Sequence, residues 1–323
     1  MFRTEITIPP VSFHVDHSTR LMTIGSCFSE VMGQKLSENR FQVKSNPFGT
    51  IFNPISIFKL LEVAIDCSQP SKSGYVQSSG IHQHLDFHSQ FGAVSKTELT
   101  SKLERAVIST HDFLKSADVL IITSGSAMVY EYQKTTKIVT NCHKLPQREF
   151  RKFMLHTDLI TSAFNVLLEK LNAFNDQLQI ILTISPVRHV RDTLVTNSLS
   201  KALLKTTSNE IVQKYNNVSY FPSFEIMIDD LRDYRFYKPD MLHPNETAEE
   251  YIWNKFVETY MSDETINTIC EWKKILKAMS HKPFNPESEA HQKFISETIS
   301  KLHGFSNKFE VSDELEALKR RLI

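Results

Sequence analysis

The segment Leu21-Met-Thr-Ile-Gly-Ser-Cys-Phe-Ser-Glu30 determines the fold that we expect for this chain. Its first four residues, Leu21–Ile24, form a mostly apolar run that predicts a buried strand. The Gly25-Ser26 pair predicts a tight turn, and apolar residues then recur at helical spacing as far as Leu36. A buried strand that leads directly into a helix is typical of a β-α unit in a parallel sheet.

Three other short apolar runs repeat this pattern. Val119–Thr123, Ile180–Ile184 and Val218–Phe221 read as strands, and segments with helical periodicity separate them. Runs that are apolar at nearly every position suit parallel strands covered on both faces. Because the connections of βαβ units place helices against both faces, the sequence predicts an α/β fold, a three-layer α/β/α sandwich with a mostly parallel sheet.

The character of the chain changes after about residue 262. The remaining segment carries three helical patterns and no strand pattern. We therefore expect an α/β domain of residues 1–262, followed by a helical C-terminal appendage of residues 263–323.

Composition excludes several classes of partner. The chain has 37 Lys+Arg against 37 Asp+Glu, so no net charge attracts nucleic acid. Its eight glycines form no dinucleotide or P-loop pattern, and we expect no cofactor. No apolar run reaches the ~18 residues of a membrane helix. The N-terminal segment lacks the apolar stretch of a signal peptide, and four scattered cysteines without CxxC spacing predict reduced thiols and a cytoplasmic protein.

Ser26 and the pair Asp240 and His243 are the main candidates for chemistry. Ser26 stands where a strand ends and a helix begins, a place where ligand crevices form and where helix N–H groups can stabilise an oxyanion. Asp240 precedes His243 by three residues, so its carboxylate can contact the imidazole Nδ1. Each feature has a structural alternative, because Ser26 could simply cap the helix and the Asp–His pair could belong to a surface turn.

Two rival sites remain open. Cys27 is a second candidate nucleophile, because a helix N-terminus lowers the pKa of a thiol. The run His82-Gln-His84-Leu-Asp86-Phe-His88 would place three His and one Asp on one face of a strand, where they could bind zinc or iron. The alternatives for this run are a solvated edge strand or a wall of the substrate cleft.

Eight short stretches, in collinear order along nearly the whole chain, resemble the GSCFA family. They are Gly25-Ser26-Cys27-Phe28, Asn46–Pro54, Asp86–Ser89, Asn141–Lys144, Ser185–His189, Phe221–Glu225, Asp229–Tyr237 and Asp240–His243. That family is grouped with the SGNH/GDSL-like hydrolases, whose α/β/α fold is flavodoxin-like. The resemblance therefore implies the same layered fold that the periodicity predicts.

The resemblance also implies a catalytic triad. By similarity to SGNH hydrolases, Ser26 would be the nucleophile, His243 the general base and Asp240 its orienting carboxylate. The implied activity is that of a serine esterase or acyltransferase that needs no metal and acts on a small-molecule or carbohydrate ester. The chain departs from the SGNH pattern at Ile24, which stands where an Asp is usual, and in lacking the Gly-x-Asn of the third block. A non-catalytic carbohydrate-binding relative therefore remains an alternative.

Loops near the ends of the predicted strands supply the expected oxyanion and substrate contacts. Gly49 and Asn46 could donate to the oxyanion, and a Ser-Gly-Ser segment after the second predicted strand stands where the third block is expected. Other residues of this kind follow the third strand or lie in the histidine run. The complete set of candidates is Asn46, Gly49, His88, Gly125, Ser126, Arg188 and His189.

Overall fold

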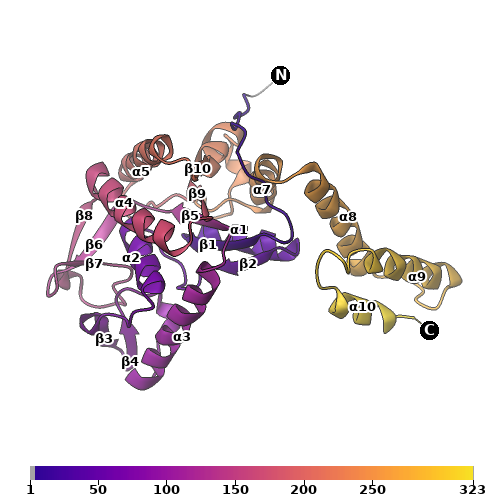
Figure 1. Ribbon diagram of the computed structural model, residues 1–323, viewed down its shortest axis with the longest axis horizontal. Helices are drawn as coiled ribbons and strands as arrows, with labels where there is room; N and C mark the ends of the chain where they lie inside the picture. Colours follow the sequence, from indigo (N-terminus) through magenta and orange to yellow (C-terminus); the bar gives the residue numbers. More distant parts are fainter. Residues whose placement is uncertain (1–3, 323) are drawn as a thin grey trace.

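A computed structural model describes residues 4–322 of the chain, with a five-stranded parallel sheet at its centre (Figure 1). The sheet consists of β1 (Arg20–Gly25), β2 (Gln42–Ser45), β5 (Val119–Ser124), β9 (Gln179–Ile184) and β10 (Val218–Phe221). Its spatial order is β10-β9-β5-β1-β2. Counted along the chain within this sheet, the order is 2-1-3-4-5, which is the flavodoxin-like arrangement.

The central strands are buried on both faces because alternate residues enter two different cores. Met22 and Ile24 of β1 belong to one core, and Leu21 belongs to the other. In register, Leu21 lies beside Val119 and Met22 lies beside Leu120, so both cores continue across the sheet. The mostly apolar runs in the sequence follow from this double burial.

Helices cover both faces, which confirms the predicted α/β/α sandwich (Figure 1). One face packs against α2 (Pro54–Ile65), α3 (Lys96–Leu114), α4 (Thr157–Phe174) and α5 (Leu194–Lys214). The other face packs against α1 (Cys27–Glu38) and α7 (Glu246–Tyr260). Since α1 and α4 follow β1 and β5 on opposite faces, the sheet has its topological switch point between these two strands.

Two small antiparallel sheets lie beside the sandwich. A hairpin joins β3 (Tyr75–Ser78) to β4 (Ile81–His84), and β6 (Met128–Tyr132) pairs with both β7 (Lys137–Val139) and β8 (Phe150–Met154). Short helical turns lie between the longer elements: η1 (Lys72–Gly74), η2 (Ser89–Phe91), η3 (Gln147–Glu149), α6 (Ser223–Glu225), η4 (Ile226–Asp230) and η5 (Tyr234–Phe236).

Three C-terminal helices extend to one side of the sandwich, as predicted (Figure 1). They are α8 (Asp263–Ser280), α9 (Glu289–His303) and α10 (Ser312–Lys319), and they share a small core of their own. Trp272 of α8 joins this core to the sandwich, since its Nε1 donates to the carbonyl of Glu38 at 2.9 Å. Within residues 4–322, no helix is both long enough and apolar enough to span a membrane.

Candidate active site at the switch point of the sheet

Gly25 ends β1 in a backbone conformation that requires glycine. Its φ is +139°, and a Cβ at this position would overlap the carbonyl oxygen of Thr123 on β5. The close approach lets the N–H of Ser26 donate to that same carbonyl at 3.0 Å. Ser26 is therefore held at the ends of β1 and β5, the pair of strands between which ligands bind in open α/β sheets.

The Ser26 hydroxyl is buried and has no role in the fold. Ser26 is the N-cap residue of α1, yet its side chain makes no capping hydrogen bond. Among the residues that the structure describes, its Oγ has no hydrogen-bond partner, and neither has the buried Oγ1 of Thr123. Buried polar atoms usually have partners, and one that lacks them is typical of a site for a ligand or for chemistry.

Asp240 and His243 form the pair that their spacing suggested. The Asp240 Oδ2 lies 2.6 Å from the His243 Nδ1, and the main-chain N–H groups of Leu242 and His243 donate to Oδ1 at 2.8 and 3.0 Å. The two N–H bonds and the imidazole lower the pKa of Asp240 to about 2, so this carboxylate is ionised at neutral pH. The loop adjoins the end of β9, because the N–H of Arg188 donates to the Leu242 carbonyl at 3.2 Å.

His189 lies between this pair and the end of β5. Its ring meets the ring of Phe52 edge-on with centroids 5.1 Å apart, and a Cβ on Gly125 would lie 3.3 Å from its Nε2. This Nε2 is buried without a hydrogen-bond partner among residues 4–322. Burial, together with the charges of Lys201 and His243, lowers the pKa of His189 to about 4, so the imidazole is neutral at physiological pH.

Lys201 is a site residue that the sequence analysis missed. It is fully buried on α5, and its Nζ donates to the carbonyls of Gly125 and Ser185 at 2.7 Å each. No carboxylate within residues 4–322 forms an ion pair with it. Burial lowers the pKa of this amine to about 7. Helical spacing in the sequence could have indicated that Lys201 is buried, because it shares the inward face of α5 with Leu204 and Ile211.

The expected main-chain and amide donors to an oxyanion are already engaged. The N–H of Gly49 donates to the Asn46 carbonyl at 2.8 Å, and the N–H groups of Gly125 and Ser126 both donate to the Phe52 carbonyl, at 2.7 and 2.9 Å. The Asn46 side chain accepts from the Gly25 N–H at 2.9 Å, while its Nδ2 lies 3.5 Å from the Ser26 carbonyl. In this conformation none of the main-chain N–H groups among them is free to hold an oxyanion.

The two remaining predicted contact residues lie on different loops. Arg188 stacks its guanidinium on the ring of Tyr237, 4.3 Å from the centroid, beside the loop that carries His243. His88 packs against Gly49 and uses its Nδ1 to accept the N–H of Gln90 at 3.4 Å. Of Arg188 and His88, only Arg188 therefore adjoins the Asp240–His243 pair.

The alternative of a metal site in the histidine run is not supported, because the strand that should align its ligands ends at His84. Both ring nitrogens of His84 are engaged, Nε2 with the Ser71 carbonyl at 2.9 Å and Nδ1 with the Asp86 N–H at 3.2 Å. The Asp86 carboxylate binds Lys59 at 2.6 Å. No group of three or more His, Cys, Asp or Glu within residues 4–322 is placed to hold a metal ion.

Cys27 is poorly activated as a nucleophile. Burial raises the pKa of its thiol, although the N–H of Phe28 and the charge of Lys201 oppose the rise. The thiolate is the reactive form, so a raised pKa disfavours attack at neutral pH.

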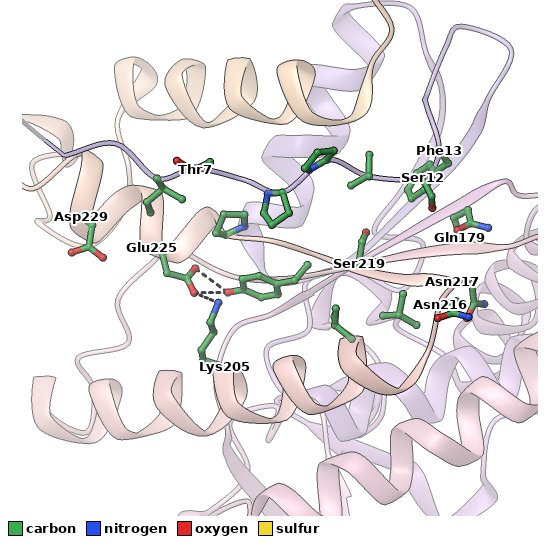
Figure 2. Close-up of a pocket in the computed structure, with 18 residues that line it drawn as sticks. Thr7, Ser12, Phe13, Gln179, Lys205, Asn216, Asn217, Ser219, Glu225 and Asp229 are labelled. Carbon is green, nitrogen blue, oxygen red and sulfur yellow. Dashed lines mark hydrogen bonds and ion pairs between the residues drawn. The ribbon is translucent and has the colours of Figure 1, made fainter.

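A large cavity lies away from these residues, at the outer edge of β10. It encloses about 720 Å³ between β10, the end of α5 and the N-terminal segment. Figure 2 shows Lys205 and Glu225 at one end of it and Asn216 and Asn217 at the other. Its most buried polar groups bind one another: Tyr220 donates to both Glu225 oxygens at 2.9 Å, and Lys205 lies 2.5 Å from the same carboxylate. None of the predicted site residues lines this cavity, so volume alone does not locate the chemistry.

Comparison with known protein families identifies the family of this chain. Residues 20–256 match the GSCFA family, and residues 272–323 match the C-terminal domain of GSCFA domain proteins. The first match contains Ser26, the Asp240–His243 pair and Lys201. No curated protein matches the chain. Because the family match extends over more than half of the 323 residues, this chain belongs to the GSCFA family.

Proposed function

We propose that this chain is a serine-dependent ester hydrolase or acyltransferase, with Ser26 as nucleophile, His243 as general base and Asp240 as the residue that orients it. The Asp240–His243 pair carries the proposal. An ionised carboxylate 2.6 Å from Nδ1 fixes the tautomer, so that Nε2 is the nitrogen that accepts a proton. Ser26 supports it, because its Oγ is free of structural hydrogen bonds at the N-terminus of α1.

The proposed reaction follows acyl transfer through a serine ester. Ser26 Oγ forms a bond to the ester carbonyl carbon while its proton passes to His243 Nε2, and the carbonyl electrons move to oxygen. When the tetrahedral oxyanion collapses, the bond to the alcohol oxygen breaks and the alcohol takes the proton from His243. Water, or a second hydroxyl compound in a transferase, then attacks the acyl-serine by the same steps and restores Ser26.

This reaction requires residues 50–52 to move. The N–H of Ile51 donates to the Gly25 carbonyl at 2.7 Å, and the Phe52 carbonyl accepts from Gly125 and Ser126, so the segment crosses the ends of β1 and β5. Beneath it Ser26 is fully buried, and its Oγ makes no hydrogen bond to His243. Contacts between a nucleophile and its base often form only in the substrate complex, and loop motion commonly precedes chemistry.

The substrate class follows from the resemblance to SGNH/GDSL-like hydrolases. We propose a small-molecule ester or an O-acylated carbohydrate, which would enter at the switch point of the sheet. We also propose the cytoplasm as the compartment, because all four cysteines are free thiols.

Hydrolysis of p-nitrophenyl acetate tests the proposal. We expect Ser26→Ala and His243→Ala each to lower kcat by at least about 10³-fold, because removing a member of a triad disables the others. Cys27→Ala is the matched control on the adjacent residue, and we expect it to keep wild-type turnover.

Each other outcome contradicts the proposal in a distinct way. Turnover of Ser26→Ala at the wild-type rate removes Ser26 from the nucleophile role. Loss of activity in Cys27→Ala alone assigns that role to the thiol. A wild-type chain that binds acetylated sugars but hydrolyses no ester would be the non-catalytic relative.

A further inference from the structure

The proposed reaction creates an oxyanion, and in the closed conformation the expected main-chain donors to it are engaged. The N–H groups of Ser26, Gly49, Gly125 and Ser126 all donate to main-chain carbonyls of the fold. An oxyanion hole needs donors that are free and already aimed at the developing charge, and removing one donor typically costs 10²–10³ in kcat. When residues 50–52 move, the Gly125 and Ser126 N–H groups lose the Phe52 carbonyl, and a side-chain donor already placed at the ends of β1 and β5 would complete an oxyanion hole with them.

His189 is the free nitrogen donor at this edge. It follows β9, on the far side of β5 from β1, and its ring reaches across to Gly125, so the imidazole lies at the end of the strand that adjoins β1. The N–H groups of Gly49, Gly125 and Ser126 are engaged in this conformation, whereas His189 Nε2 is buried and has no partner among residues 4–322. The ring packs edge-on against Phe52 with centroids 5.1 Å apart, and the main-chain N–H of His189 donates to Asn197 Oδ1 at 2.9 Å.

The two histidines of the site have different environments. His243 carries the Asp240 carboxylate on Nδ1, which suits a group that accepts a proton. The charged and titratable groups that face His189 are Lys201, His243 and Asp192, and burial with the first two keeps its imidazole neutral. A neutral imidazole with a low pKa is a weak base, but it donates a hydrogen bond without a change of charge.

We propose that His189 is a catalytic residue of this site, whose Nε2–H donates to the oxyanion formed at Ser26, and that Lys201 is a positioning residue beneath it. The inference rests on the proposed function. Lys201 holds the carbonyls of Gly125 and Ser185 at 2.7 Å each, so it ties together the ends of β5 and β9 between which the His189 ring lies.

Two substitutions at His189 test the inference with p-nitrophenyl acetate. His189→Phe keeps a ring against Phe52 and Gly125 but removes the N–H, and we expect kcat to fall by about 10²–10³-fold with little change in KM. His189→Gln restores a neutral N–H donor, and we expect it to recover at least about tenfold of that loss. The shape of the pH–rate profile should be the same in wild type and in His189→Gln, because the residue does not titrate during turnover.

The rate of modification of Ser26 by a fluorophosphonate separates the two proposals. Phosphonylation of Ser26 in the wild type, slowed in His189→Phe and partly restored in His189→Gln, supports the inference. Equal rates in wild type and His189→Phe overturn it while leaving Ser26 as the nucleophile. An unmodified Ser26 in the wild type overturns the proposed function and the inference with it. If His189→Phe fails to fold, as judged by its thermal transition, His189→Gln becomes the test. Loss of the acid limb of the pH–rate profile in His189→Gln would show that His189 is the base, which overturns the inference.

Discussion

Gly25 shows how one residue shapes the site. We predict that Gly25→Ala lowers the free energy of unfolding by more than about 3 kcal/mol, because a Cβ overlaps the rigid carbonyl of Thr123 and the φ of +139° disfavours any side chain. Gly80→Ala is the matched control, since its φ is also positive but no atom lies within 4 Å of the added Cβ. We expect that control to cost only about 1 kcal/mol. Urea titrations measure both values, and equal costs would contradict the clash.

The buried amine of Lys201 should make the free energy of unfolding depend on pH. Its pKa is about 7 in the folded chain against 10.5 for an ordinary lysine, so the unfolded chain binds more protons between these pH values. The free energy of unfolding should therefore rise with pH from about 7 towards 10.5, by at most about 1.4 kcal/mol per unit, relative to Lys201→Met. Urea titrations of both chains at several pH values check this. A pH-independent difference would show that the buried amine does not titrate in this range.

Replacing Asp240 with asparagine removes the charge of the carboxylate but keeps the shape of the side chain. Because its pKa is about 2, Asp240 is ionised throughout the neutral range, and Asp240→Asn removes a full charge there. We expect kcat/KM for p-nitrophenyl acetate to fall by about 10³–10⁴-fold, as the histidine loses its orienting acceptor. Asp233→Asn is the control, because its carboxylate binds only the Arg235 N–H of a nearby turn. Equal activity of the two variants would contradict the triad.

Among the elements, we expect the segment of residues 50–52 to control access to Ser26. The ring of Phe52 is partly exposed and packs on His189. We predict that Phe52→Ala raises the rate of fluorophosphonate modification of Ser26 severalfold, because the cover over the site becomes smaller. Phe284→Ala removes a fully exposed ring far along the chain and serves as the control. A lower rate in Phe52→Ala would assign the ring to substrate binding instead of closure.

Elements with one dominant local pattern were predictable, and the others were not. Four central strands follow from their apolar runs, because each is buried on both faces. The helix α5 has a less regular apolar pattern, because its inward face carries Asn197, Ser200 and Lys201 beside the apolar residues. The strands of the two small sheets mix polar and apolar residues, and β4 ends at His84, which is why the histidine run does not align its ligands.

The candidate site also contains some contacts that the sequence predicts and others that it does not. The Asp240–His243 contact was predictable because both residues belong to one short loop. The engagement of the Gly125 and Ser126 N–H groups depends on the Phe52 carbonyl, more than 70 residues away along the chain. Such long-range hydrogen bonds leave no local pattern in the sequence, so the identity of the oxyanion donor could not be predicted.

At the scale of the whole molecule, Trp272 joins the C-terminal helices to the sandwich. It is fully buried, donates to the Glu38 carbonyl at 2.9 Å and lies under the guanidinium of Arg40. We predict that Trp272→Ala lowers the free energy of unfolding by about 3–5 kcal/mol. Lys274→Ala, on the same helix but exposed, should change it by no more than about 0.5 kcal/mol. Denaturant titration of the full chain compares them, and equal stability would show that the helices do not support the sandwich.

We propose that folding brings the Ser26 hydroxyl and the His243 imidazole to one edge of the sheet, where they act as a catalytic pair. The most direct test treats wild type and His243→Ala with a fluorophosphonate and maps the modified residue by peptide mass spectrometry. We predict a single adduct on Ser26 in the wild type and a rate at least about 10³-fold lower in His243→Ala. An unmodified Ser26, or equal modification of both chains, would contradict it.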